Sequence, residues 1–150
     1  MRMLRIGAIV ASAAATMFLT AVPAHATNYP IDGDYARQDG CRADQEVIFH
    51  KVLNLNGTAI GYIDLMYSVN CHAAWAHAHS VSPSSETWAL HAEIHRTNDG
   101  KVYDQRAVDG TQDAYSPMVY DKDPLSSFAK IIIDPNGCCG VEYSAKTDAY

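Results

Sequence analysis

Hydrophobic and polar positions alternate along much of the chain after residue 40, and this period of two is the spacing that β-strands produce. The clearest example is residues 88–95 (WALHAEIH), where large or small apolar side chains occupy every second position. The turn sequence Asn98-Asp99-Gly100 follows, and residues 101–108 continue as a second run. Since Asp-Gly between two such runs is a strong hairpin signal, we expect an antiparallel hairpin here.

A second hairpin is predicted closer to the amino end. Residues 47–55 form a strand-like run with an irregularity near Lys51. The turn signal Asn56-Gly57 then leads into residues 60–67, which are rich in residues that favour strands. These two runs are expected to pair across the turn.

Further short strands are expected at residues 131–133 and within residues 141–150, and further turns at residues 109–110 and 135–137. No stretch after residue 26 predicts a helix longer than a turn or two. Many short strands separated by turns favour an all-β fold, either a small antiparallel β-sandwich or a barrel.

The first 26 residues have the three parts of a secretory signal peptide. Residues 1–5 carry two arginines, residues 6–22 are apolar, and Ala24-His25-Ala26 ends the stretch with small residues at both critical positions. The alternative is a retained membrane anchor, but this apolar stretch is short and rich in alanine for a span that needs about 20 strongly apolar residues. We therefore expect cleavage after Ala26 and a secreted, extracellular protein without a membrane partner.

Processing would leave residues 27–150, which is enough for one domain. Within it, residues 27–40 are expected to form an extended arm and residues 41–150 a single β domain. Removal of the leader takes away Arg2 and Arg5 but no acid, so the 11 Lys and Arg fall to nine against 17 Asp and Glu, and the net charge becomes −8. Such a chain is a poor ligand for phosphate backbones, which argues against nucleic acid as a partner.

The arm has no apolar periodicity and is interrupted by Pro30, Gly33 and Gly40. The chain has 9 tyrosines. Most of them suit half-buried strand positions, whereas the two in the arm have no core to join and favour recognition. A segment without strand partners can add to another protein as a strand or lie in its groove. The residues predicted to bind a partner are Asn28, Tyr29, Pro30, Ile31, Asp32 and Tyr35.

Four cysteines follow the leader: Cys41, Cys71, Cys138 and Cys139. An even number in an exported chain indicates two disulfides. Neighbouring cysteines have Cα atoms about 3.8 Å apart, whereas a relaxed disulfide wants about 5.5–6 Å. Geometry thus favours two disulfides in which Cys41 bonds to one of Cys138 and Cys139, and Cys71 bonds to the other. Zinc binding is the competing interpretation, but no pair has the C-x₂-C spacing of a structural zinc site.

Six histidines remain after processing and raise the question of a bound metal: His50, His72, His77, His79, His91 and His95. Residues 91–95 (HAEIH) do not match the H-E-x-x-H zinc motif, and on a strand their two histidines would lie about 13 Å apart. His77 and His79 would face the same side of a strand and are the remaining candidates. We expect no metal, and histidines that are exposed or paired across strands.

No motif in the sequence identifies catalytic residues. There is no G-x-S-x-G nucleophile elbow, and no free cysteine remains if both disulfides form. The carboxylates that could pair for glycoside hydrolysis are Asp64, Glu86, Glu93 and Asp104. A filled sandwich of this size leaves little room for a deep cleft, so we expect a protein that is not an enzyme and has no cofactor.

Residues 65–76 (LMYSVNCHAAWA) resemble the signature of the YjfA-like family of small secreted bacterial proteins, also described as a domain of unknown function. The family pattern follows a Gly-Cys step, which Gly40-Cys41 supplies here, and the resemblance extends over about residues 30–150. It implies a β fold, secretion and no established catalytic residues. It also favours a disulfide between Cys41 and Cys71, because relatives often lack the other two cysteines. In this chain, Cys138 and Cys139 would then form a vicinal bridge or pair between chains.

Similar small secreted domains in actinomycetes are linking subunits of antibacterial umbrella toxin particles. There they join a lectin-bearing component to a repeat-containing toxin chain. The resemblance therefore implies a non-catalytic adaptor whose partners are other secreted proteins, a lectin-like chain and a repeat-containing toxin. Two alternatives stay open: a free-standing extracellular envelope or glycan-binding protein, and a small secreted hydrolase or hydrolase inhibitor.

Overall fold

The computed structural model describes residues 27–84, 89–135 and 141–150. Several features that the sequence analysis singled out lie outside these residues: the predicted signal peptide, Glu86, Trp88, most of the turn at residues 135–137, and the pair Cys138 and Cys139.

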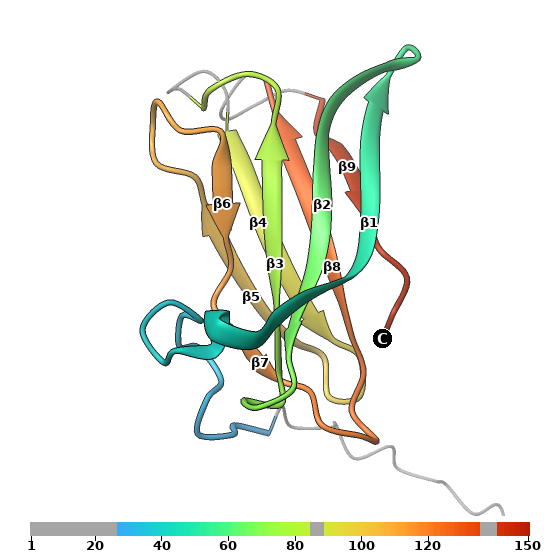
Figure 1. Ribbon diagram of the computed structural model, residues 1–150. Coiled ribbons are helices and arrows are strands. Elements are labelled where there is room, and N and C mark those ends of the chain that lie inside the picture. The colour runs from blue at the N-terminus through green and yellow to red at the C-terminus, as the bar shows by residue number, and fades with distance from the viewer. Residues whose placement is uncertain (1–26, 85–88, 136–140) are drawn as a thin grey trace, which may run out of the picture.

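Two antiparallel sheets pack face to face and form a β-sandwich (Figure 1). The five-stranded sheet has the order β1-β2-β3-β6, and β7 also pairs with β3; the four-stranded sheet has the order β5-β4-β8-β9. The strands of the described residues are β1 Gln45–Leu55, β2 Thr58–Ser68, β3 Ala73–Ser80, β4 Ala89–Arg96, β5 Lys101–Arg106, β6 Asp113–Tyr115, β7 Val119–Tyr120, β8 Ser127–Asp134 and β9 Tyr143–Lys146. This architecture confirms the predicted all-β fold.

Helical structure is confined, in the described part of the chain, to one short turn, η1 (Cys41–Asp44). No helix among those residues is long and apolar enough to cross a membrane.

Both predicted hairpins are present. β1 and β2 are joined at Asn56 and Gly57, whose φ angles of 50° and 84° lie in the left-handed region that these residue types tolerate. β4 and β5 are joined through residues 97–100, where the Asp-Gly turn was expected. The irregularity predicted near Lys51 occurs as two shifts in register, one on each side of that residue.

The core between the sheets is built from apolar side chains at alternate positions of the strands. β2 supplies Ile63 and Leu65, β4 supplies Ile94, and β8 supplies Ile131 and Ile133, all at most 1% exposed. Burial of each such side chain stabilises the fold by about 1.5–3 kcal/mol. This packed core therefore holds the backbone of both sheets rigid, and with it the side chains on their outer faces.

A second, smaller apolar cluster lies on the outer face of the five-stranded sheet. Met66, Ala73 and Trp75 of the sheet pack there against Ala36 of the amino-terminal segment and Cys41 of η1. Figure 1 shows this segment, in blue to teal, beside β6 and β7, and the chain that leads from η1 into β1 crosses in front of β3. The segment covers one end of the outer face and leaves the other end to polar and aromatic side chains.

Cys41 is bonded to Cys71, with an S–S distance of 2.01 Å and a Cα–Cα distance of 5.8 Å. This is the pairing that the family resemblance favours. The geometric expectation, in which both would bond to Cys138 and Cys139, is wrong. The geometric argument considered only the strain of a disulfide between neighbouring cysteines. In the folded chain, Cys41 lies against the turn between β2 and β3 that contains Cys71.

The amino-terminal segment, residues 27–40, turns several times and packs on the domain. Backbone hydrogen bonds close turns from Tyr29 to Asp32 (2.9 Å) and from Tyr35 to Gln38 (2.8 Å). The expectation that the two tyrosines have no core to join is corrected by this arrangement, because Tyr29 packs on Tyr120 of β7 and Tyr35 bonds to Gln105 of β5.

Candidate functional site

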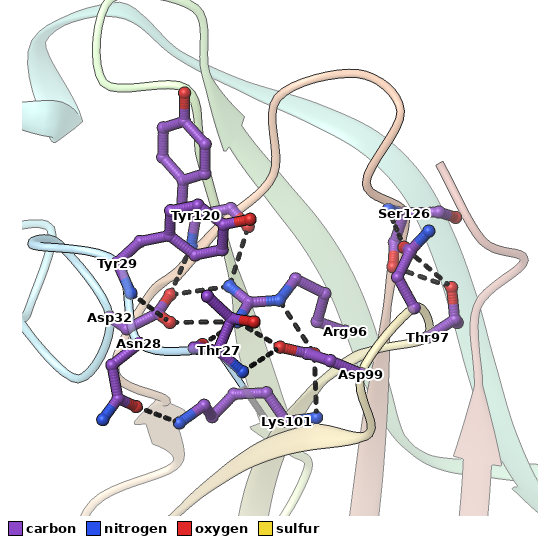
Figure 2. Close-up of polar contacts among 11 residues, drawn as sticks. Thr27, Asn28, Tyr29, Asp32, Arg96, Thr97, Asp99, Lys101, Tyr120 and Ser126 are labelled. Carbon is purple, nitrogen blue, oxygen red and sulfur yellow. Dashed lines mark hydrogen bonds and ion pairs between the residues drawn. The ribbon is translucent and has the colours of Figure 1, made fainter. Parts of the chain in front are cut away.

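The amino-terminal segment is fastened to the domain by one fully buried arginine, Arg96, at the end of β4 (Figure 2). Its Nη1 and Nη2 donate to the two carboxyl oxygens of Asp32, at 2.8 and 3.0 Å. Its Nε and Nη2 donate to Asp99, at 3.0 and 2.8 Å. The backbone carbonyls of Thr27 and Tyr120 accept further hydrogen bonds, at 2.6 and 3.0 Å. We call this set of contacts the Arg96 lock.

The Arg96 lock shifts the pKa values of its members. Burial acts to lower the pKa of Arg96, but the hydrogen bonds to Asp99 and Asp32 outweigh burial and raise it. The hydrogen bond from Arg96 lowers the pKa of Asp99 to about 2. The guanidinium and the Asp99 carboxylate are therefore both charged at neutral pH, which strengthens their hydrogen bonds.

The residues predicted to bind a partner largely contact their own domain. Asp32 belongs to the Arg96 lock. The ring of Tyr29 stacks on Tyr120, with centroids 4.6 Å apart, and Tyr35 donates a 2.5 Å hydrogen bond to Gln105. These contacts hold the segment in a defined conformation on the sheet.

The other three predicted residues lie nearer to the surface. Asn28 accepts a hydrogen bond from Lys101, Ile31 packs against the cluster on the outer face, and Pro30 is exposed. A partner that took this segment as an added strand would first have to open the Arg96 lock. We therefore expect a partner to meet the segment in its closed form.

Thr27 stands next to the predicted cleavage site, and its backbone nitrogen donates a 2.8 Å hydrogen bond to Oδ2 of Asp99 (Figure 2). Cleavage after Ala26 would turn this nitrogen into a charged α-ammonium group. We expect a chain that begins at Thr27 to be about 1 kcal/mol more stable than one with extra residues before it, because a charge-assisted hydrogen bond contributes more than a neutral one. Urea unfolding of the two forms measures the difference.

The pH dependence is the control for this prediction. The gain should be present below about pH 7 and be lost at alkaline pH, where an α-amino group with an ordinary pKa of about 8 loses its proton. Equal stability of the two forms under mildly acidic conditions would contradict the ion pair.

Three histidines gather on the uncovered end of the five-stranded sheet. His77 and His79 of β3 both bond to Asp113 of β6, at 2.8 and 3.0 Å. His50 of β1 bonds to Asp64 of β2 at 2.6 Å, and Asp64 also lies 3.5 Å from His77. The predictions that His77 and His79 face the same side and that histidines pair across strands are confirmed.

Aromatic rings complete this surface. Tyr62 stacks on His79, with 4.9 Å between centroids, and Tyr115 stacks on His77, with 4.4 Å. The guanidinium of Arg42 lies 4.4 Å from the centroid of the Tyr115 ring. We call the surface the histidine face; its members are His50, Tyr62, Asp64, His77, His79, Asp113 and Tyr115.

The pKa values on the histidine face follow from its hydrogen bonds and partial burial. Burial acts to raise the pKa of Asp113, but the hydrogen bonds from His77 and His79 outweigh burial and lower it. The Asp113 carboxylate is therefore charged at neutral pH and orients both rings. Burial raises the pKa of Tyr62, so its hydroxyl group stays protonated.

In the described ranges, no group of three or more histidine, cysteine, aspartate or glutamate side chains is arranged to hold a metal ion. His91 and His95 lie on the four-stranded sheet, where His91 bonds to Asp104 at 3.0 Å and His95 to Glu93 at 2.7 Å. Two of the candidate carboxylates for glycoside hydrolysis are thus paired with histidines on the sheet opposite to Asp64.

Beside the histidine face lies a pocket of about 600 Å³, bounded by the amino-terminal segment, β5 and β6. Three arginines line it: Arg37 and Arg42, which are close in sequence, and Arg106, which is distant from both. We call it the arginine pocket. It could not be found from the sequence, because the net charge of the chain is negative and only the fold brings Arg106 to the other two.

The fold and these two surfaces define a class of protein. It is a small disulfide-bonded β-sandwich whose amino-terminal segment is fastened to the domain by a buried arginine. The chain belongs to the family described as protein of unknown function DUF2690, whose model matches residues 30–130. It is similar to the uncharacterized protein YjfA of Bacillus subtilis (strain 168), with 32% identity over 126 residues that cover 77% of this chain and 80% of that protein. The resemblance to the YjfA-like family is thereby confirmed. No solved structure matches the chain at a significant level.

Proposed function

We propose that the chain is a secreted, non-catalytic protein-binding domain and that its partner docks on the histidine face. The observation that carries the proposal is the set of stacked tyrosine and histidine rings on the uncovered end of the five-stranded sheet. Tyrosine and arginine are enriched among the residues that dominate binding energy at interfaces. Here Tyr62, Tyr115 and Arg42 stand together on one surface.

The side chains of the histidine face are ordered before any partner arrives. Asp113 orients His77 and His79, and Asp64 orients His50. Side chains that are already held in place lose less conformational entropy on binding. This arrangement favours rigid docking with little rearrangement of the domain.

An adaptor needs a second contact surface, and the outer face of the four-stranded sheet is a candidate. It carries the stacked rings of His95 and Phe128, 4.6 Å apart, with Lys146 5.2 Å from the Phe128 ring centroid. Two opposite faces would let one domain join two chains. Together with the family resemblance, this supports a role in linking a lectin-like chain to a repeat-containing toxin in a secreted antibacterial complex.

The proposal is tested by partner capture with matched variants of the tagged, processed protein, purified from the culture supernatant of its own host. The double variant Tyr62→Ala/Tyr115→Ala removes rings from the histidine face. The double variant Lys122→Gln/Asp148→Asn changes two exposed residues that belong to neither of the two faces and is the control. We expect mass spectrometry to identify a stoichiometric secreted partner that the control retains and that the first variant loses by at least about tenfold.

Recovery of the chain alone, or equal capture by both variants, would contradict the proposal. Each variant must keep the cooperative unfolding of the wild type, so that a loss of capture reports a lost contact. Deletion of residues 27–39 is a poor substitute for these variants, because it removes Asp32, one of the two carboxylate partners of Arg96, and so disturbs the fold itself.

Glycan binding is a second candidate function, favoured by one observation: the stacked rings lie beside carboxylates on the same face. Aromatic rings can cover the apolar face of a sugar ring while carboxylates accept hydrogen bonds from its hydroxyl groups. A panel of cell-envelope glycans tested with the same two variants separates the functions. Saturable glycan binding that Tyr62→Ala/Tyr115→Ala abolishes, without any captured protein, would favour the second candidate.

A further inference from the structure

We propose that the arginine pocket binds a carboxylate group of an acidic peptide segment carried by the partner protein. This inference rests on the proposed protein-binding function and adds the chemistry by which the partner is recognised. Two observations carry it: three arginines of an acidic chain line one pocket, and aromatic and aliphatic side chains make up much of the rest of its wall.

The arginine pocket is positively charged, although the chain is acidic. Of the nine Lys and Arg residues that follow the predicted leader, three line this pocket. Arg37 and Arg106 are exposed and Arg42 is half-buried. Arg106 also forms an ion pair with Asp109, at 3.7 Å. The acidic residue that lines the described part of the pocket, Asp113, is already bonded to two histidines.

Trp75 forms part of the wall of the same pocket and is 1% exposed. The signal of its indole group can therefore report a ligand that enters the pocket. Guanidinium groups match the two oxygens of a carboxylate in a bidentate geometry. The arginines thus point to a carboxylate as the ligand group.

The rest of the pocket wall favours an amino-acid carboxylate over a free anion. Tyr35, Trp75 and Tyr115 contribute rings, and Ala107 and Val108 contribute aliphatic groups. A volume of about 600 Å³ is larger than a single carboxylate fills and lies within the range of pockets that enclose small ligands. A glutamate with an apolar neighbour in sequence would satisfy both the charged and the apolar parts of the wall.

NMR of the indole groups tests the proposal, because the chain has 2 tryptophans. The substitution Trp88→Phe leaves Trp75 as the single source of an indole N–H signal. The probe is a blocked peptide in which glutamate alternates with leucine, and the matched control peptide carries glutamine in place of glutamate. We expect a saturable shift of the Trp75 signal with the first peptide and no shift with the second.

Two double variants decide whether the arginines bind the probe. Arg37→Gln/Arg42→Gln should weaken peptide binding by at least about tenfold. Lys51→Gln/Lys122→Gln removes the same number of charges from exposed positions away from the pocket lining and should leave the affinity unchanged. Both variants are compared only where their amide spectra show the dispersed signals of the wild-type fold.

Three results would overturn the proposal. They are the absence of a Trp75 shift with glutamate peptide at millimolar concentration, equal weakening by both double variants, and an equal response to inorganic phosphate or glucuronate. If any of them occurs while Tyr62→Ala/Tyr115→Ala still abolishes partner capture, the proposed function stands and the pocket chemistry fails. If the peptide binds as expected but no protein is captured, the pocket assignment stands and the proposed function fails.

Discussion

Replacing Arg96 by methionine is expected to lower the free energy of unfolding by about 3–5 kcal/mol. The substitution keeps a long side chain but leaves the carboxylates of Asp32 and Asp99, 1% and 12% exposed, without their cation. Removal of one partner from a buried ion pair is costly because the remaining charge is buried and uncompensated. Urea unfolding followed by tryptophan fluorescence measures the loss, and limited proteolysis reports whether residues 27–40 are released.

The matched control is Arg37→Met, because Arg37 is exposed and surface substitutions usually change stability by less than about 0.5 kcal/mol. Adding Asp32→Asn to Arg96→Met should recover part of the loss, since the two sites are in contact and couple. A loss below about 1 kcal/mol for Arg96→Met would show that apolar contacts, and not the Arg96 lock, hold the amino-terminal segment.

The substitution Asp121→Asn is expected to stabilise the protein by up to about 3 kcal/mol at neutral pH and to have little effect near pH 4. Asp121 is 2% exposed, and neither of its carboxyl oxygens has a hydrogen-bond partner among the residues that the structure describes. Burial raises the pKa of Asp121 from 3.8 to about 6, although Ser127 and Arg96 act in the opposite direction.

The protonation state of Asp121 in the folded and the unfolded chain decides the sign of the change in stability. Below pH 3.8 the carboxyl group of Asp121 is largely protonated in the folded and the unfolded chain, so aspartate and asparagine differ little. As the pH rises towards 6, the unfolded chain ionises freely in water while the folded chain resists ionisation, and each unit of raised pKa costs about 1.4 kcal/mol. The wild type therefore loses stability through this window, and Asp121→Asn does not.

Urea midpoints measured at several pH values across this window test the prediction. The exposed Asp148 provides the control substitution, Asp148→Asn, which should track the wild type at every pH. A stability difference between Asp121→Asn and the wild type that does not change with pH would mean that the pKa of Asp121 is the same in the folded and the unfolded chain, and would contradict the prediction.

The two long hairpins are predictable from sequence because their turns need particular residue types. Asn56-Gly57 and Asp99-Gly100 can be identified without any knowledge of the fold, and the alternation on each side then aligns the strands. β6 and β7 have three and two residues, too few for a periodic pattern. The position of Asp113 opposite His77 and His79 could therefore not be predicted, although the shared side of the two histidines could.

The amino-terminal segment is harder to predict, because a buried ion pair between distant residues leaves no periodic pattern. Asp32 resembles any surface acid in an acidic chain, yet its side chain is 1% exposed because Arg96, 64 positions away, neutralises it. The arginine pocket is hidden for the same reason. The disulfide between Cys41 and Cys71 follows from the family resemblance, whereas spacing alone favours a different pairing.

The contact between Thr27 and Asp99 has a consequence for maturation. With processing after Ala26, the Arg96 lock acquires its last charged member only when the leader is removed. The precursor would then carry a weaker form of the same fold, with its amino end less firmly held. If the chain is exported as predicted, such a precursor would be easier to keep unfolded during passage across a membrane, and removal of the leader would both release the protein and complete the Arg96 lock.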